Sequence, residues 1–143
     1  MPTRNAEAVW KGTLQDGEGS MKVESGAFDV PFSFRTRFEA AEGTNPEELI
    51  GAAHAGCYSM ALAHMLTEAG YAPEQVHTVA HVQIDQVEGG FKISFVSLET
   101  EAAVPEIDEA TFQQTAEQAK TGCPVSQALA GTDIRLQARL KSA

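Results

Sequence analysis

The feature that most constrains the fold is an almost uncharged stretch from Glu42 to Gly70, EGTNPEELIGAAHAGCYSMALAHMLTEAG. Asn45 and Pro46 form a helix-start signal, because asparagine caps free backbone N–H groups and proline at the first helical position loses no hydrogen bond. Gly70 ends the stretch as the residue type that most easily adopts a left-handed conformation. We therefore predict one long helix here.

Apolar side chains surround this predicted helix instead of forming a single stripe. A helix that is apolar all round is a buried helix. A small domain with few strands has difficulty covering such a helix on every side, so we infer a dimer in which the partner supplies the missing cover. The apolar positions are Leu49, Ile50, Ala52, Ala53, Ala55, Met60, Ala61, Leu62, Ala63, Met65 and Leu66.

Alternating apolar and polar residues predict strands before the helix. Residues 7–14 and a return strand through 21–25 form a hairpin, with Asp16-Gly17-Glu18-Gly19 as its turn. A third strand is predicted over residues 28–38, with phenylalanines on its apolar face and both arginines on its polar face. This meander needs a cover, for which the central helix is the obvious candidate.

The chain after the helix shows a second set of patterns, which together predict a hairpin, two helices and a strand. The predicted segments are strands at 76–87 and 91–101, a helix from Asp108 to Gly122, a short helix over 124–130 and a strand over 134–140.

The resulting order, βββ-α-ββ-αα-β, predicts an α+β fold with antiparallel sheets wrapped around a long central buried helix. With 143 residues, the chain is expected to form one domain over residues 1–143. Its net charge of −10 argues against nucleic acids and anionic membranes as partners. The N-terminus has no targeting pattern, and His54, Ser59 and His64 interrupt the one apolar run. We therefore expect a soluble cytoplasmic protein.

Two cysteines stand 66 positions apart, too few for a disulfide framework. Cys57 in mid-helix is either a small core residue or a nucleophile whose thiolate needs a cation from elsewhere. In Gly122-Cys123-Pro124, Cys123 is predicted to cap the next helix, whose backbone N–H groups would make its thiol acidic. On local physics, Cys123 is the more acidic of the two.

Charged residues flank the helix start. Arg35 and Arg37 lie on the polar face of the predicted strand, where arginine usually meets only solvent, but Arg37 ends the strand just before the helix. Glu47 and Glu48 complement the helix dipole in the first turn.

Histidines leave two further hypotheses open. His54, Cys57 and His64 share one helix face and could form a metal site with Cys123, although no metal-binding motif accompanies them. His54 could instead act as a general base to Cys57.

The sequences FRTRFEAAEGTNPEELIGAAHAGCYSMAL and AKTGCPVSQAL resemble the OsmC/Ohr family, and the OsmC (osmotically inducible protein) branch more than the Ohr (organic hydroperoxide resistance) branch. The resemblance extends over nearly the whole chain. It implies a tightly intertwined homodimer and a thiol-dependent peroxidase acting on organic hydroperoxides and hydrogen peroxide.

Carried over by motif, Cys57 is the peroxidatic cysteine and Cys123 the resolving one, joined as a disulfide during turnover. Arg37 is the activating cation and Glu47 the acid that orients it. No metal or organic cofactor is implied; an external thiol or dithiol is the reductant. Apolar walls from Met60 and Phe34 would favour alkyl hydroperoxides. The competing hypothesis is a non-catalytic α+β dimer that binds a hydrophobic ligand, with structural cysteines.

Overall fold

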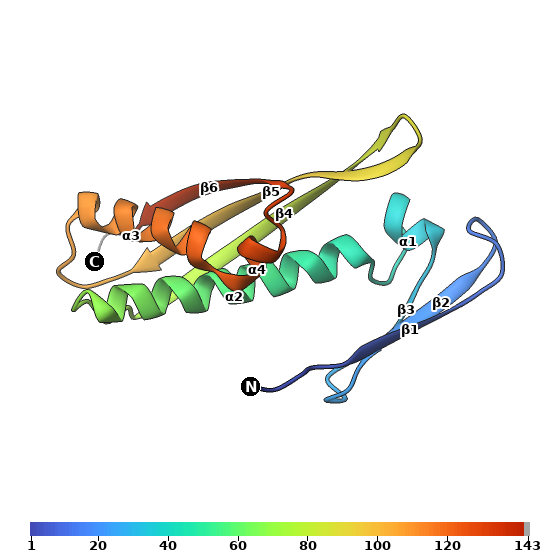
Figure 1. Ribbon diagram of the computed structural model, residues 1–143, viewed down its shortest axis with the longest axis horizontal. Coiled ribbons are helices and arrows are strands. Elements are labelled where there is room, and N and C mark those ends of the chain that lie inside the picture. Colours follow the sequence, from blue (N-terminus) through green and yellow to red (C-terminus); the bar gives the residue numbers. More distant parts are fainter. Residues whose placement is uncertain (142–143) are drawn as a thin grey trace. The chain divides into compact units, whose positions relative to one another are not determined.

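The computed structural model describes residues 1–141, which form helices and strands in the order βββ-αα-ββ-αα-β (Figure 1). This confirms the predicted α+β class and adds one short helix to the predicted order. The chain divides into two compact units, Met1–Leu49 and Ile50–Ala143, and the boundary falls in the first turn of the long helix.

The N-terminal unit contains an antiparallel sheet of β1 (Ala6–Lys11), β2 (Glu18–Val23) and β3 (Asp29–Phe32). Trp10 on β1 lies opposite Gly19 on β2, and its ring stacks at a tilt on Phe32 with 5.3 Å between ring centroids. A Cβ atom at Gly19 would lie 2.5 Å from the Val9 carbonyl oxygen, so only glycine fits there.

The predicted strand through residue 38 is wrong in its second half, because α1 (Phe34–Phe38) is a helical turn. Ser33 caps it: its hydroxyl accepts from the Thr36 N–H, and the Thr36 hydroxyl accepts from the Ser33 N–H at 2.8 Å. The two phenylalanine rings at its ends lie 4.8 Å apart. A spacing of four residues puts two side chains on the same side of a strand and also of a helix, so the apolar pattern could not distinguish a strand from a helix here.

The long helix α2 (Pro46–Glu68) is continuous and confirms the predicted caps. The Asn45 side-chain oxygen accepts from the Glu48 N–H at 2.7 Å, and Gly70 has the left-handed φ of 96° past the helix end. The N–H of Tyr71 closes the end by donating to the Leu66 carbonyl.

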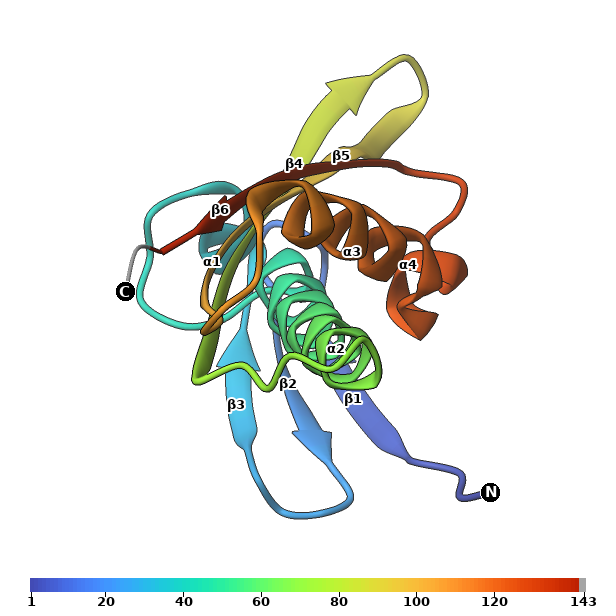
Figure 2. The ribbon, with the colours of Figure 1, turned by 90° about the vertical axis from the view of Figure 1, so that its left-hand side faces the viewer.

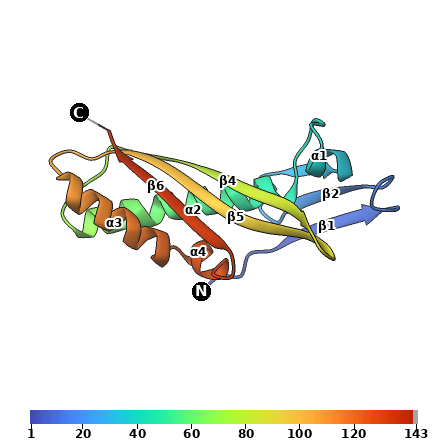
Figure 3. The same cartoon turned by 90° about the horizontal axis from the view of Figure 1, so that it is seen from above.

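The second unit contains a mixed sheet. β4 (Gln75–Val87) and β5 (Gly90–Ala103) form the expected antiparallel hairpin, but β6 (Asp133–Leu140) runs parallel to β5. The expectation of purely antiparallel sheets is therefore wrong for this strand. The reason is the crossover through α3 (Glu109–Gly122) and α4 (Pro124–Ala128), which returns the chain to the end of the sheet where β5 starts (Figure 3).

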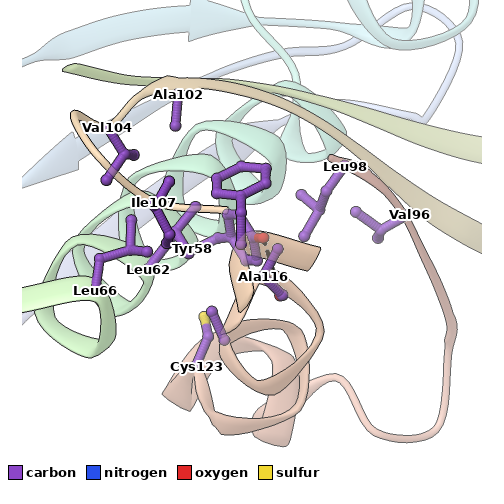
Figure 4. Close-up of a cluster of buried hydrophobic side chains, with 12 residues drawn as sticks. Tyr58, Leu62, Leu66, Val96, Leu98, Ala102, Val104, Ile107, Ala116 and Cys123 are labelled. Carbon is purple, nitrogen blue, oxygen red and sulfur yellow. Dashed lines mark hydrogen bonds between the residues drawn. The ribbon is translucent and has the colours of Figure 1, made fainter. Parts of the chain in front are cut away.

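Helices α2 and α3 cover the same face of this sheet (Figure 2). Asp108, at the predicted start of this helix, caps α3 and accepts from the Thr111 N–H at 2.9 Å. The buried side chains between the helices and the sheet form one apolar cluster, with Cys123 at its edge (Figure 4). The cluster contains Tyr58, Leu62, Leu66, Val96, Leu98, Ala102, Val104, Ile107, Phe112, Ala116, Ala119 and Cys123.

Only one face of α2 is buried in the single chain. Four of its buried residues recur every four positions: His54, Tyr58, Leu62 and Leu66. The small residues Ala52, Ala53 and Gly56 are exposed, and so is Met60, at 76%. The single chain thus buries one face of the helix that was expected to be buried on every side, and leaves other parts of it exposed.

By length and composition alone, α2 is the one helix in residues 1–141 that is apolar enough to cross a membrane. However, two of its buried side chains are polar and bonded within the protein. His54 contacts Ser126, and the Tyr58 hydroxyl donates to the Ala116 carbonyl at 3.0 Å. We interpret α2 as a core helix.

Candidate active site

The two cysteines, far apart in the chain, meet in the second unit. Cys57 lies in the middle of α2, and Cys123 lies between α3 and α4. Their sulfur atoms are 2.9 Å apart, and both thiols are free. A disulfide bond measures about 2.05 Å, so a small movement would join them.

Cys123 occupies the predicted N-cap position of α4, with Pro124 following it. Its side chain makes no capping hydrogen bond to the helix. The buried Cys123 thiol instead donates to the Cys57 sulfur.

Burial raises the pKa of the Cys57 thiol, and the hydrogen bond with Cys123 raises it further. A hydrogen bond with the Val125 backbone lowers the same pKa. Val125 is the second residue of α4, so one backbone group at the helix start that was expected to serve Cys123 acts on Cys57 instead. Sequence reasoning missed Val125, because only the packing of α4 on α2 brings its backbone to this sulfur.

In the N-terminal unit, Arg37 and Glu47 form an ion pair. Arg37 Nε donates to Glu47 Oε1 at 2.7 Å, and the Glu47 side chain is only 8% exposed. The other carboxylate oxygen of Glu47 is buried and has no hydrogen-bond partner within residues 1–141.

Arg35 and Glu48, the sequence neighbours of Arg37 and Glu47, lie at the protein surface. Arg35 is 73% exposed on its side chain and approaches Glu39 at 3.9 Å. Both arginines lie on α1 and not on a strand, so they do not share one face as expected. Glu48 is exposed and accepts from the Thr44 hydroxyl at 2.7 Å.

A cavity of about 450 Å³ lies beside Arg37 within the N-terminal unit. Most of its wall is apolar and aromatic. Its lining residues are Trp10, Gly12, Leu14, Phe32, Ser33, Phe34, Arg37 and Phe38.

His54 is fully buried, and its Nε2 atom is 2.7 Å from the Ser126 hydroxyl oxygen. Burial lowers the pKa of His54. Its Nδ1 atom has no partner within residues 1–141, and no group of three or more metal-binding side chains occurs in that part of the chain. His64, the other histidine of the metal hypothesis, is exposed. Sequence reasoning missed Ser126, whose only signal was its place three residues after the capping cysteine.

The sequence matches known proteins over nearly its full length. The family model of the OsmC-like proteins matches residues 39–137. The chain is 49% identical to the peroxiredoxin OsmC of Escherichia coli (strain K12) over 140 residues, 97% of each protein. It is 35% identical over 123 residues to the organic hydroperoxide resistance protein of Xanthomonas axonopodis pv. citri, covering 83% of this chain and 84% of that protein.

Solved structures confirm the fold class. An organic hydroperoxide resistance protein OsmC from Legionella pneumophila superposes with a TM-score of 0.76 at 23% identity, over 97% of this chain and 98% of that chain. The organic hydroperoxide resistance protein OhrB of Bacillus subtilis superposes with a TM-score of 0.69 at 25% identity, over 96% and 98%. By its sequence and its fold, the chain belongs to the family of OsmC-like proteins.

Proposed function

We propose that this chain is a thiol-dependent peroxidase that reduces organic hydroperoxides and hydrogen peroxide through a Cys57 sulfenic acid and a Cys57–Cys123 disulfide. The observation that carries the proposal is the 2.9 Å separation of the two free sulfurs. In the alternative, a hydrophobic-ligand binder, Cys123 would serve as a cap, yet its side chain makes no capping bond. Relatives named peroxiredoxin and organic hydroperoxide resistance protein support the peroxidase.

The proposed reaction has three steps: reduction of the peroxide, formation of the disulfide and reduction of the disulfide. The Cys57 thiolate attacks one peroxide oxygen, the O–O bond breaks, and an alcohol or water leaves with a proton while Cys57 becomes a sulfenic acid. The Cys123 thiol then attacks the Cys57 sulfur, which forms the disulfide and releases water. An external thiol or dithiol reduces the disulfide by exchange and is itself oxidised.

The first step needs a thiolate, but burial and the neighbouring thiol raise the pKa of Cys57. We assign the missing cation to Arg37, which would stabilise the thiolate and donate hydrogen bonds to the peroxide oxygens as charge develops. Glu47 holds the guanidinium through its Nε and leaves the other N–H groups for the substrate. Glu47 is therefore a positioning residue for Arg37.

The cavity beside Arg37 supports organic hydroperoxides as the preferred substrates. Its aromatic wall, which includes Phe34, offers an alkyl chain a place out of water. Met60, the other predicted wall residue, is exposed on α2 and would meet the alkyl chain in the assembled protein.

The acting form is proposed to be an intertwined homodimer of one domain, residues 1–143, in which a second copy covers the exposed face of α2. Nothing lies within 4 Å of the position where a Cβ atom would stand on Gly56, so another helix could approach closely there. Exposed Met60 supplies the apolar area such a contact needs.

The proposal requires no metal or organic cofactor, because sulfur carries the electrons at every step. It also places the protein in the cytoplasm, where small thiols keep both cysteines reduced between turnovers.

Counting free thiols tests the proposal. After one equivalent of an alkyl hydroperoxide, the peroxidase should lose both thiols per chain and form no cross-link between chains, as non-reducing electrophoresis would show. A ligand-binding protein with structural cysteines would keep both thiols.

A further inference from the structure

We propose that His54 and Ser126 form a positioning pair that keeps Cys123 within reach of Cys57 and so limits overoxidation of the Cys57 sulfenic acid. This inference rests on the proposed disulfide chemistry and adds residues that the three chemical steps do not use.

The pair connects the same two segments as the sulfurs do. His54 stands one turn before Cys57 on α2, and Ser126 stands three residues after Cys123 on α4. The imidazole Nε2 and the serine hydroxyl oxygen are 2.7 Å apart, and both side chains are buried.

α4 needs such an anchor because it is only five residues long. Its N-cap Cys123 contributes no side-chain capping bond. Within residues 1–141, the side-chain hydrogen bonds from α2 to residues 123–128 are those of the Cys57 sulfur, with Cys123 and with the Val125 backbone, and the His54–Ser126 bond. Oxidation of Cys57 changes the sulfur that makes the first two bonds, whereas the His54–Ser126 bond does not involve that sulfur.

The local environment makes this bond difficult to break. His54 already has one buried nitrogen without a partner in residues 1–141, and burial lowers its pKa. The ring is therefore neutral near pH 7, and separation from Ser126 would leave both of its nitrogens unsatisfied away from water. Such a separation is costly, which keeps α4 against α2.

The sulfenic acid has two competing fates. Attack by the Cys123 thiol yields the disulfide and water. Attack on a second hydroperoxide transfers one oxygen atom to the sulfur, giving sulfinic acid and an alcohol. The division between these products depends on the position of Cys123 and the peroxide concentration, and it is independent of the rate of the first step.

The test compares Ser126→Ala with Ser59→Ala. Each removes one serine hydroxyl: Ser126 bonds His54 at 2.7 Å, whereas Ser59 on α2 donates to Thr78 at 2.8 Å, away from α4. Reduced protein is titrated with an alkyl hydroperoxide, and mass spectrometry counts disulfide and sulfinic acid. We expect Ser126→Ala to reach half sulfinic acid at about tenfold lower peroxide, the effect of one buried hydrogen bond, with Ser59→Ala unchanged.

A second pair of variants separates positioning from loss of structure. Glutamine can place an amide near the Nε2 position, so His54→Gln should keep the wild-type ratio of disulfide to sulfinic acid. His54→Leu cannot bond Ser126 and should show the same ratio as Ser126→Ala. Should His54→Leu fail to fold, Ser126→Ala decides alone. The same ratio of disulfide to sulfinic acid in Ser126→Ala and in the wild type would overturn the inference. If wild-type protein forms no disulfide, the proposed function itself fails, which is a different result.

Discussion

Glu47 Oε1 accepts a hydrogen bond from Arg37 Nε at 2.7 Å, which ties α1 to the first turn of α2. The carboxylate is nearly buried, while the arginine side chain is 36% exposed. The Nη groups of Arg37 make no hydrogen bond within residues 1–141, so they remain for a ligand. In this geometry Glu47 holds the guanidinium of Arg37 through its Nε atom and so fixes the orientation of the group.

The first prediction concerns this cation. Arg37→Ala should slow the reaction of Cys57 with peroxide about 10²- to 10³-fold, the usual effect of removing one donor to developing charge. Arg37→Lys should recover part of the rate, since lysine keeps the charge but lacks the planar fork. Stopped-flow measurement of sulfenic acid formation gives these rates.

Arg35→Ala is the control for the cation. Arg35 lies on the same short helix but is exposed and only approaches Glu39 at 3.9 Å, so its loss should leave the rate unchanged. Equal losses at both arginines would point to general electrostatics and contradict a specific contact.

The second prediction concerns the order of events at the two sulfurs. Cys57→Ser should abolish peroxide consumption. Cys123→Ser should complete one turnover per chain and stop at the sulfenic acid, because the thiol 2.9 Å away is gone. Trapping with a dimedone probe, followed by mass spectrometry, locates the oxidised residue. A sulfenic acid on Cys123 in the Cys57→Ser protein would reverse the assigned roles.

The third prediction joins the proposed dimer to the chemistry. Glu47 precedes Cys57 by ten residues on the continuous helix α2, which corresponds to about 15 Å of rise. A glutamate side chain cannot span that distance, so we expect Glu47 to act with the cysteine of the second copy. Antiparallel packing of two α2 helices would bring each helix start near the middle of its partner.

Mixing Glu47→Ala and Cys57→Ser chains after unfolding tests this arrangement. Half of the randomly formed dimers are mixed and each carries one complete site, so about a quarter of all sites should work. Activity assays on the refolded mixture give this fraction. No recovery, with mixed dimers demonstrated by mass spectrometry, would place both residues in one chain.

The fourth prediction is a pH dependence of stability. Burial lowers the pKa of His54 below its ordinary value of 6.5. The folded protein therefore resists protonation, so this contribution to stability is complete above pH 6.5 and is lost as the pH falls toward the folded-state pKa. The free energy of unfolding should decline by at most about 1.4 kcal/mol per pH unit there. Urea titrations between pH 5 and 7 should show a smaller decline for His54→Gln, and equal slopes would refute the assignment.

Local features of the fold were predictable because a few neighbouring residues encode them. Asn45 and Gly70 marked the ends of α2, and both act as predicted. Asp108 and the Cys123-Pro124 sequence marked the starts of α3 and α4 for the same reason. Caps depend on backbone groups within one turn, so the sequence alone determined these elements and the α+β class.

Other features were decided only by tertiary structure. Phe34 and Phe38 are four residues apart, a spacing that fits a strand and a helix equally. The Ser33–Thr36 capping box selected the helix. The parallel direction of β6 depended on where two crossover helices return the chain.

The geometry of the candidate site was also decided only by the tertiary structure. Sequence motifs identified Cys57 and Cys123, but their 2.9 Å contact, the Val125 backbone hydrogen bond and the His54–Ser126 bond all arise from packing α4 on α2. These contacts join residues about 70 positions apart, and no local periodicity specifies which side chains will meet across such a distance. Only the folded core, by burying both helices together, brings the two sulfurs into contact.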